Sequence, residues 1–236
     1  FIAILFISIE VLIYLSGERT AFLIMIIIIL FSIFMVSNNK YFRILTLAIS
    51  LLIIYAATIS INSVYDRNIS ETMSQLGINK DSKRINLFSP QHENYYIAGY
   101  KIFLDNKILG SGPNTFRKFC GNEKYRYNES CSTHPHNNYV QLMSEAGLLG
   151  IGFFAIIFVF ISYYCTKHFI YLNFKKKMIF SNYQICLIAT VFCSIFPLIP
   201  SMNLFNNWIN IVYFLPVGFL LHSFDTQLKE ANVIKK

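Results

Sequence analysis

Long apolar stretches alternate with short polar connections over most of the chain. A helix that crosses a bilayer needs about 20 mostly apolar residues. Six segments meet this condition or nearly so, and we expect membrane helices over residues 1–15, 20–37, 43–62, 147–165, 183–201 and 207–222. One long polar loop, residues 63–146, separates the first three helices (1–62) from the last three (147–222), and residues 223–236 form a tail. The pattern predicts an all-α integral membrane protein with a large, partly helical loop.

Basic residues near helix ends predict the orientation, because short cytoplasmic connections carry an excess of Lys and Arg. They gather in the 38–42 connection with its flank, the 166–182 connection and the tail: Lys40, Arg43, Lys167, Lys175, Lys176, Lys177, Lys229, Lys235 and Lys236. Counting helices places all three on one side, which we expect to be the cytoplasm. The SGERT turn, the long loop and the SMNLFNN turn then face the other side.

Composition supports a membrane protein and excludes some other classes. Only 14% of the residues are charged, against roughly 25% in soluble domains. Lysines that contact anionic headgroups account for the net charge of +8, so we expect the lipid bilayer as a partner and no nucleic acid. Phe1 opens the chain inside an apolar run, from which we expect the C-terminal portion of a longer protein.

Part of the long loop has helical periodicity. In HENYYIAGYKIFLDNKILG, five apolar residues share one helix face: Tyr96, Tyr100, Phe103, Leu104 and Ile108. Such a helix would lie on the outer membrane surface or cover the ends of the bundle. The following GSGPN predicts a turn, since it lacks the Lys-Ser/Thr and the preceding strand of a nucleotide-binding loop.

Two of the five cysteines, Cys120 and Cys131, lie in the outer loop. A disulfide is expected if that side is oxidising. The alternative is a zinc site that adds His134 and His136. Its spacing, C-x10-C-x2-H-x-H, differs from that of known zinc fingers, and Pro135 restricts how the two histidines converge, so we expect no metal.

Two arginines are candidates for binding an anion. Arg19, in YLSGERTAFL, stands at a membrane boundary, where a permanent cation is costly unless it snorkels to headgroups or meets an anion such as Glu18 or a phosphate. A planar guanidinium suits a diphosphate because it donates two parallel hydrogen bonds. Arg84, in DSKRINLF, is either an ordinary solvated cation or a second contact for the same diphosphate.

The stretch HPHNNYVQLMSEAGLLG carries further candidate chemistry at the start of a helix. His134 and His136 could exchange a proton near neutral pH. Asn137 follows at the helix N-terminus, where backbone amides favour anions. Glu145 lies nine residues after His136 and is either a remote partner or interfacial.

Three ordered segments resemble the O-antigen ligase and O-antigen polymerase superfamily. SGERTAFL resembles its S/T-G-x-R-x-A-x-L segment, and ILGSGPNTF its P-L-L-G-x-G-x-x-x-F element. HPHNNYVQLMSEAGLLG resembles its H-x-H-N-x-Y-L-Q-x-x-x-E-x-G-x-x-G signature. PLIPSMNLFNNW is also similar to the end of the family's sequences.

The resemblance implies a metal-independent, inverting glycosyltransferase of the GT-C type that needs no cofactor. Its donor would be a glycan on undecaprenyl diphosphate, at the periplasmic face of the bacterial inner membrane. Its acceptor would be lipid A–core for a ligase or a growing glycan for a polymerase. Arg19 matches the family's diphosphate-binding arginine and His136 its essential histidine, with His134, Asn137 and Glu145 as substrate-binding neighbours. Arg84 corresponds to the loop arginine, although about ten extra residues follow it.

The sequence leaves other functions open. Ligase and polymerase share these motifs, and the resemblance favours the ligase. A transporter would carry several polar residues inside its helices, whereas Glu10 is the one acid or base well inside an expected helix here. A scaffold protein would not require the Arg–His constellation.

Overall fold

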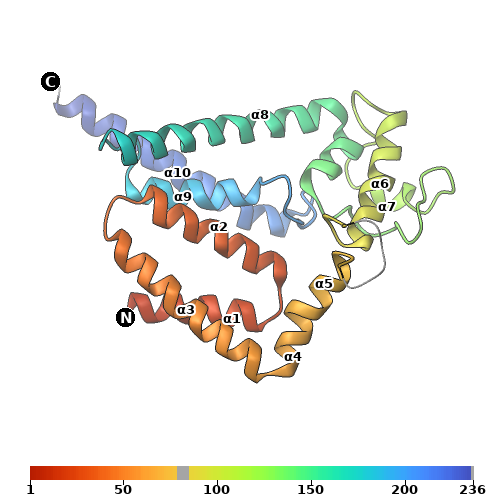
Figure 1. Cartoon of the computed structure of the whole chain (residues 1–236). Helices are drawn as coiled ribbons and strands as arrows, with labels where there is room; N and C mark the ends of the chain where they lie inside the picture. Colours follow the sequence, from red (N-terminus) through yellow and green to blue (C-terminus); the bar gives the residue numbers. More distant parts are fainter. Residues whose placement is uncertain (79–84, 235–236) are drawn as a thin grey trace.

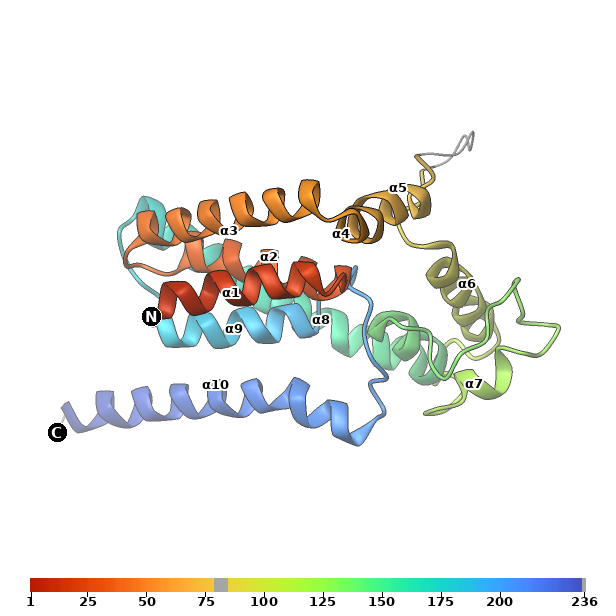
Figure 2. The same cartoon turned by 90° about the horizontal axis from the view of Figure 1, so that it is seen from below.

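The computed structural model describes residues 1–78 and 85–234, and the described residues contain helices and no strand. Six apolar helices run side by side (Figures 1 and 2). They are α1 (Ile2–Leu15), α2 (Arg19–Met35), α3 (Lys40–Ser60), α8 (Asn138–Phe174), α9 (Asn182–Ser194) and α10 (Asn207–Ile234). Short helices and turns gather at one end of this bundle, which we call the loop end: α4 (Asn62–Tyr65), η1 (Asp66–Ser70), α5 (Glu71–Gln75), α6 (Pro90–Asp105) and α7 (Phe116–Phe119).

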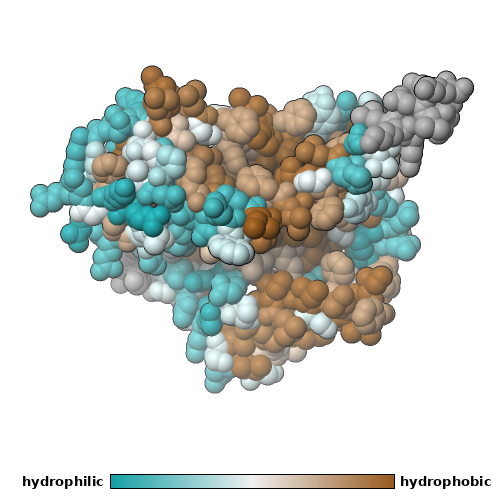
Figure 3. All heavy atoms as spheres, turned by 180° about the vertical axis from the view of Figure 1, so that it is seen from behind, coloured by the Kyte–Doolittle hydropathy of each residue, from teal (hydrophilic) through white to brown (hydrophobic). Residues whose placement is uncertain are grey.

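Within the described residues, three helices are long and apolar enough to cross a membrane: Lys40–Ser60, Asn138–Phe174 and the Asn207–Thr226 part of α10. The other three apolar helices, α1, α2 and α9, have 14, 17 and 13 residues. The structure is therefore that of an all-helical membrane protein, whereas the count of six spans remains a prediction. Figure 3 shows hydrophobic residues over the helical bundle and hydrophilic residues gathered at the loop end.

The two ends of the bundle differ as the charge pattern predicts. The α1–α2 turn, the long loop and the α9–α10 connection lie at the loop end, while the α2–α3 and α8–α9 connections lie at the other end with both chain termini (Figure 1). Some boundaries differ from expectation. α9 stops at Ser194 because Pro197 and Pro200 follow and cannot continue a helix. α8 starts nine residues before the expected Gly147 boundary, and α10 continues to Ile234 without a separate tail.

Glycines allow the turn after α6 to press against α8. Gly147 has φ +65°, a left-handed conformation that kinks α8. A Cβ atom on Gly147 would lie 2.4 Å from the carbonyl oxygen of Ile108, and one on Gly110 would lie 2.3 Å from the carbonyl carbon of Glu145. Backbone hydrogen bonds join the two segments: Ser111 N to Ser144 O, Gly112 N to Glu145 O and Leu148 N to Lys107 O. The turn after α6, with Gly110, and the segment of α8 around Gly147 are thus packed closely and hydrogen-bonded to each other.

The face that α6 packs against α8 is not the apolar face that the periodicity predicts. The buried residues of α6 are Tyr95, Ala98, Gly99 and Ile102, whereas Tyr100, Leu104 and Ile108 are exposed. Close packing, rather than side-chain size, selects the face against α8, and contact of the predicted apolar face with the outer membrane surface stays a prediction. At Gly99 an added Cβ would lie 2.6 Å from a methyl carbon of Val140 in α8.

Candidate functional site

The two histidines of the HPHNN segment lie side by side at the start of α8. Their ring centroids are 4.1 Å apart, with His134 6% exposed and His136 partly buried. His136 has φ +55°, an uncommon backbone conformation for a residue with a side chain. Such strain persists only where the surroundings enforce it, and it often accompanies function.

Asn137, the residue that follows His136, is the N-cap of α8. Its Oδ1 accepts hydrogen bonds from the backbone N–H groups of Tyr139 (2.9 Å) and Val140 (3.1 Å), the usual task of an N-cap. Its Nδ2 donates to the carbonyl oxygen of Pro197 at 2.8 Å, and the residue is only 3% exposed. The structure therefore gives Asn137 a positioning role, and its expected substrate contact stays a prediction.

The α9–α10 connection holds the histidine segment from the other side. Ser201 N donates to the carbonyl oxygen of His136 at 3.0 Å. The Ser201 carbonyl oxygen lies 3.3 Å from Nε2 of His134, and Ser201 Oγ donates to Oδ1 of Asn138 at 2.8 Å. Thus PLIPS and HPHNN, more than 60 residues apart, form one unit.

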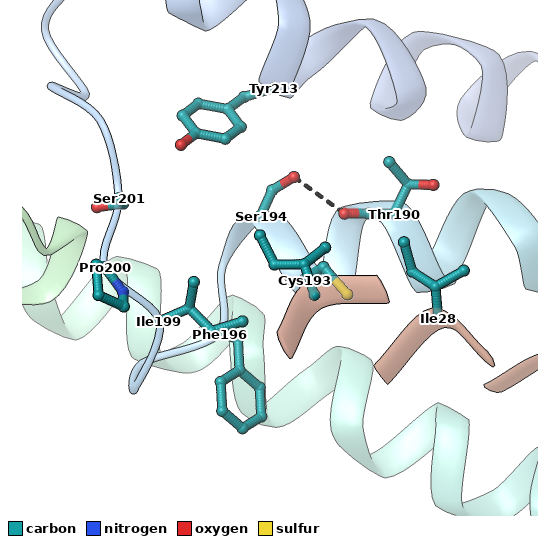
Figure 4. Close-up of a pocket in the computed structure, with 10 residues that line it drawn as sticks. Ile28, Thr190, Cys193, Ser194, Phe196, Ile199, Pro200, Ser201 and Tyr213 are labelled. Carbon is teal, nitrogen blue, oxygen red and sulfur yellow. Dashed lines mark hydrogen bonds between the residues drawn. The ribbon is translucent and has the colours of Figure 1, made fainter. Parts of the chain in front are cut away.

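An apolar cavity of about 120 Å³ adjoins this unit between α2, α9 and α10. Ser201 and Tyr213 face it, and Ser194 donates a hydrogen bond to the Thr190 carbonyl oxygen (2.9 Å) in its wall (Figure 4). Apolar space therefore lies directly behind the residue that holds both histidines.

A third histidine, which sequence reasoning missed, contacts His136. The ring centroid of His92, in the first turn of α6, is 5.8 Å from that of His136, and Tyr95 stacks on His136 at 5.3 Å. The apolar face predicted for this helix includes Tyr96 but neither His92 nor Tyr95. The sequence therefore offered no signal for His92 except a histidine near the start of a helix.

All three imidazoles have lowered pKa values. Burial lowers the pKa of His134 to about 4, assisted by the charge of His136 and opposed by the hydrogen bond to Ser201. Burial also lowers the pKa of His136, and that of His92 is lowered by burial, then by His136 and Arg19. All three rings are therefore neutral at pH 7 and able to accept a proton. At pH values between the lowered pKa of the folded state and the ordinary pKa of the unfolded chain, the folded state binds fewer protons than the unfolded chain. Acidification through that pH range therefore destabilises the fold.

Arg19 is brought to the same region. It is the first residue of α2, its Nη1 donates to Thr72 Oγ1 at 3.3 Å, and its charge acts on His92. Arg67 lies over the neighbouring Gly17 and pairs with Glu18 at 3.6 Å. The structure thus places a partly buried arginine near the histidines, whereas Arg84 lies outside the described residues.

Glu145 does not face the histidines. It is 1% exposed, and its carboxylate accepts hydrogen bonds from Phe116 N (2.7 Å), Asn114 N (3.2 Å) and Gln141 Nε2 (3.0 Å). These donors belong to the GSGPNTF turn and to α8 itself. The structure therefore gives Glu145 the role of joining the turn to α8, and its expected substrate contact stays a prediction.

Cys120 and Cys131 form a disulfide with their Cα atoms 4.8 Å apart. Their sulfur atoms are therefore bonded to each other rather than placed for the alternative zinc set with His134 and His136. The described residues hold no group of three or more His, Cys, Asp or Glu that could bind a metal ion.

The disulfide is expected to stabilise the histidine segment, since it closes a loop that ends just before His134. In the chain-entropy model such a loop contributes about 3 kcal/mol. The double variant Cys120→Ser/Cys131→Ser should therefore unfold at a lower temperature, measured by thermal unfolding in detergent. The matched variant Cys186→Ser, at an exposed free cysteine, should leave the unfolding temperature unchanged, and equal values for both variants would contradict the expectation.

Glu10 lies outside this site. It is 3% exposed and accepts a hydrogen bond from Ser50. With Arg43 it lines a separate cavity of about 270 Å³ between α1, α2 and α3.

Apolar helices with a polar, histidine- and arginine-containing candidate site at the loop end define a multi-helix membrane protein. Residues 2–155 match the family described as O-antigen ligase, and the chain belongs to that family. No match was found among curated proteins or among solved structures. Membership confirms the resemblance of the three motifs and indicates glycosyltransferase-like ligase or polymerase activity.

Proposed function

We propose that the protein transfers a glycan from an undecaprenyl-diphosphate carrier to a sugar hydroxyl at the periplasmic face of the inner membrane. The observation that carries the proposal is the neutral, strained His136 at the loop end of an apolar bundle, in contact with His92, on which the charge of Arg19 acts. Family membership supports this class of reaction. The acceptor proposed is lipid A–core, as in an O-antigen ligase.

The reaction needs few groups from the protein. The acceptor hydroxyl oxygen attacks the anomeric carbon from the face opposite the diphosphate, so the configuration inverts. The bond from that carbon to the diphosphate oxygen breaks, and the hydroxyl proton passes to a ring nitrogen of His136. Diphosphate is already a good leaving group, so positioned cations and a base or hydrogen-bond acceptor suffice, without a metal.

The remaining residues position these groups. Arg19 and, as a proposal carried over from the sequence, Arg84 would bind the diphosphate. His134, neutral over most of the pH range, would pack beside His136 and orient the acceptor. The apolar cavity behind Ser201 would accept part of the polyprenyl chain.

A repeat-unit polymerase is the second candidate, because the family indicates ligase or polymerase activity and the same site would serve both. The two differ in the acceptor, and therefore in the size of the product. Membranes with the full-length protein, undecaprenyl-diphosphate oligosaccharide and lipid A–core should yield a single transfer to the core. A ladder on the lipid carrier would establish the polymerase, and no product from folded protein would overturn both.

The variant Arg19→Lys is expected to lower donor turnover by roughly ten- to a hundredfold, since a charged hydrogen bond contributes about 1.5–3 kcal/mol. Lysine keeps the charge but loses the two parallel hydrogen bonds. Initial transfer rates against donor concentration measure the effect, with Arg117→Lys, at an exposed residue of α7, as the matched control. Unchanged turnover would mean that Arg19 only snorkels to headgroups.

A further inference from the structure

His92 is the feature of the site that neither the motifs nor the family match explains. It lies in the first turn of α6, a helix that begins at Pro90 with Ser89 as N-cap. Ser89 Oγ lies 2.8 Å from Nδ1 of His92 and also accepts from the backbone N–H of His92. The ring is thereby fixed through one nitrogen, and Nε2 makes no hydrogen bond with any residue that the structure describes.

The surroundings of His92 belong to the proposed site. Its ring meets that of His136 edge to face at 5.8 Å and lies 6.3 Å from Tyr95 and 6.2 Å from Tyr96. The hydroxyl of Tyr96 is itself buried without a hydrogen-bond partner of normal geometry. Among the described residues, the charged and titratable groups that act on His92 are Arg19 from α2, His136 from the histidine segment and the two tyrosines of its own helix. No described acid is among them.

We propose that His92 is, beside Arg19, a further cationic contact for the donor diphosphate, taking up a proton from solvent as the donor binds and donating a hydrogen bond from Nε2 to the diphosphate. The inference rests on the proposed function, because it assigns the ligand to the same site. No covalent step is involved. The imidazole of His92 is neutral before the donor binds and positively charged in the donor complex.

The charges around the ring give the direction of this change. Before the donor binds, three factors lower the pKa of His92: burial, His136 and Arg19. A diphosphate beside Arg19 neutralises that cation and places an anion near the ring, which raises the pKa. Binding is then coupled to proton uptake, so donor affinity rises as the pH falls through the range between the two pKa values.

A purely structural His92 predicts something different. As a packing residue it would affect the stability of α6, but it would make no contribution to the pH dependence of donor affinity. Arginine, a larger and permanently charged side chain, would not restore such a role. As a diphosphate contact, His92 should be replaceable by arginine.

The test measures binding of undecaprenyl-diphosphate-linked N-acetylglucosamine to the purified full-length protein between about pH 6 and pH 8. Each phosphate of this probe carries one ester and one anhydride bond and keeps a single, strongly acidic hydroxyl, so the probe does not titrate in that range. Wild-type affinity should fall by up to about tenfold as the pH rises by one unit through the pKa of His92 in the complex. His92→Arg should bind well and lose most of this dependence, while His92→Gln should bind weakly at every pH. His222→Gln, at an exposed histidine of α10, should behave as wild type.

The outcomes separate the inference from the proposed function. If wild-type protein binds the probe with the same pH dependence as His92→Arg and His92→Gln, the inference is overturned while the proposed function stands. If His92→Arg binds as weakly as His92→Gln, His92 is a packing residue and the inference is also overturned. If folded wild-type protein neither binds the probe nor transfers its sugar, the proposed function fails with it.

Discussion

Replacing His136 is expected to reduce glycan transfer by about 10²- to 10⁴-fold, the usual contribution of a general base. The informative substitution is His136→Asn, because asparagine tolerates the left-handed backbone conformation that His136 adopts (φ +55°). Alanine at that position would combine loss of the imidazole with added backbone strain. Initial transfer rates at saturating donor measure the effect.

The control for this variant is His222→Asn on α10, whose side chain is exposed. Both proteins should reach the membrane in equal amounts and unfold at similar temperatures. Full activity of His136→Asn would remove His136 from the mechanism. A loss of both folding and activity would show that the histidine segment depends on the imidazole, and His136→Gln would then separate packing from proton transfer.

The variant Glu145→Ala is expected to cause the largest loss of stability. It removes a buried carboxylate that accepts hydrogen bonds from Asn114 N, Phe116 N and Gln141 Nε2. A buried donor left without a partner costs roughly 1–3 kcal/mol, so several kcal/mol of stability should be lost. Because the carboxylate joins the GSGPNTF turn to the start of α8, transfer should fall as well.

Thermal unfolding in detergent measures this effect, and Glu129→Ala, at an exposed loop acid, is the matched control. Glu145→Gln should be intermediate, since the amide keeps one accepting oxygen but turns an NH₂ group toward other donors. Wild-type stability of Glu145→Ala would contradict the positioning role. If the variant remained stable but no longer bound donor, the substrate contact first expected from the sequence would regain support.

The sequence predicted features that depend on local pattern. Apolar runs predicted helices, and three of them are long enough to span a membrane. The resemblance of three segments to known motifs predicted the family, which the match over residues 2–155 confirms. These signals lie in consecutive residues and need no knowledge of how segments meet.

Features that depend on distant contacts could not be predicted. The hydrogen bond from Asn137 to the carbonyl oxygen of Pro197, sixty residues away, could not be read from the HPHNN segment. Periodicity predicted an apolar face of α6 that includes Tyr100, but the face against α8 depends on Gly99, which allows Val140 to approach closely. His92 lies in the site because α6 packs on α8. The residues next to His92 in the sequence do not indicate that contact.

The most direct test of the central claim is the stoichiometry of transfer by the full-length wild-type protein in proteoliposomes. Donor glycan on undecaprenyl diphosphate and lipid A–core would be supplied together in the presence of a metal chelator. The account predicts one undecaprenyl diphosphate released for each glycan joined to an acceptor, with inverted configuration at the new bond. Folded protein that releases no undecaprenyl diphosphate, or that gives a product of retained configuration, would contradict it.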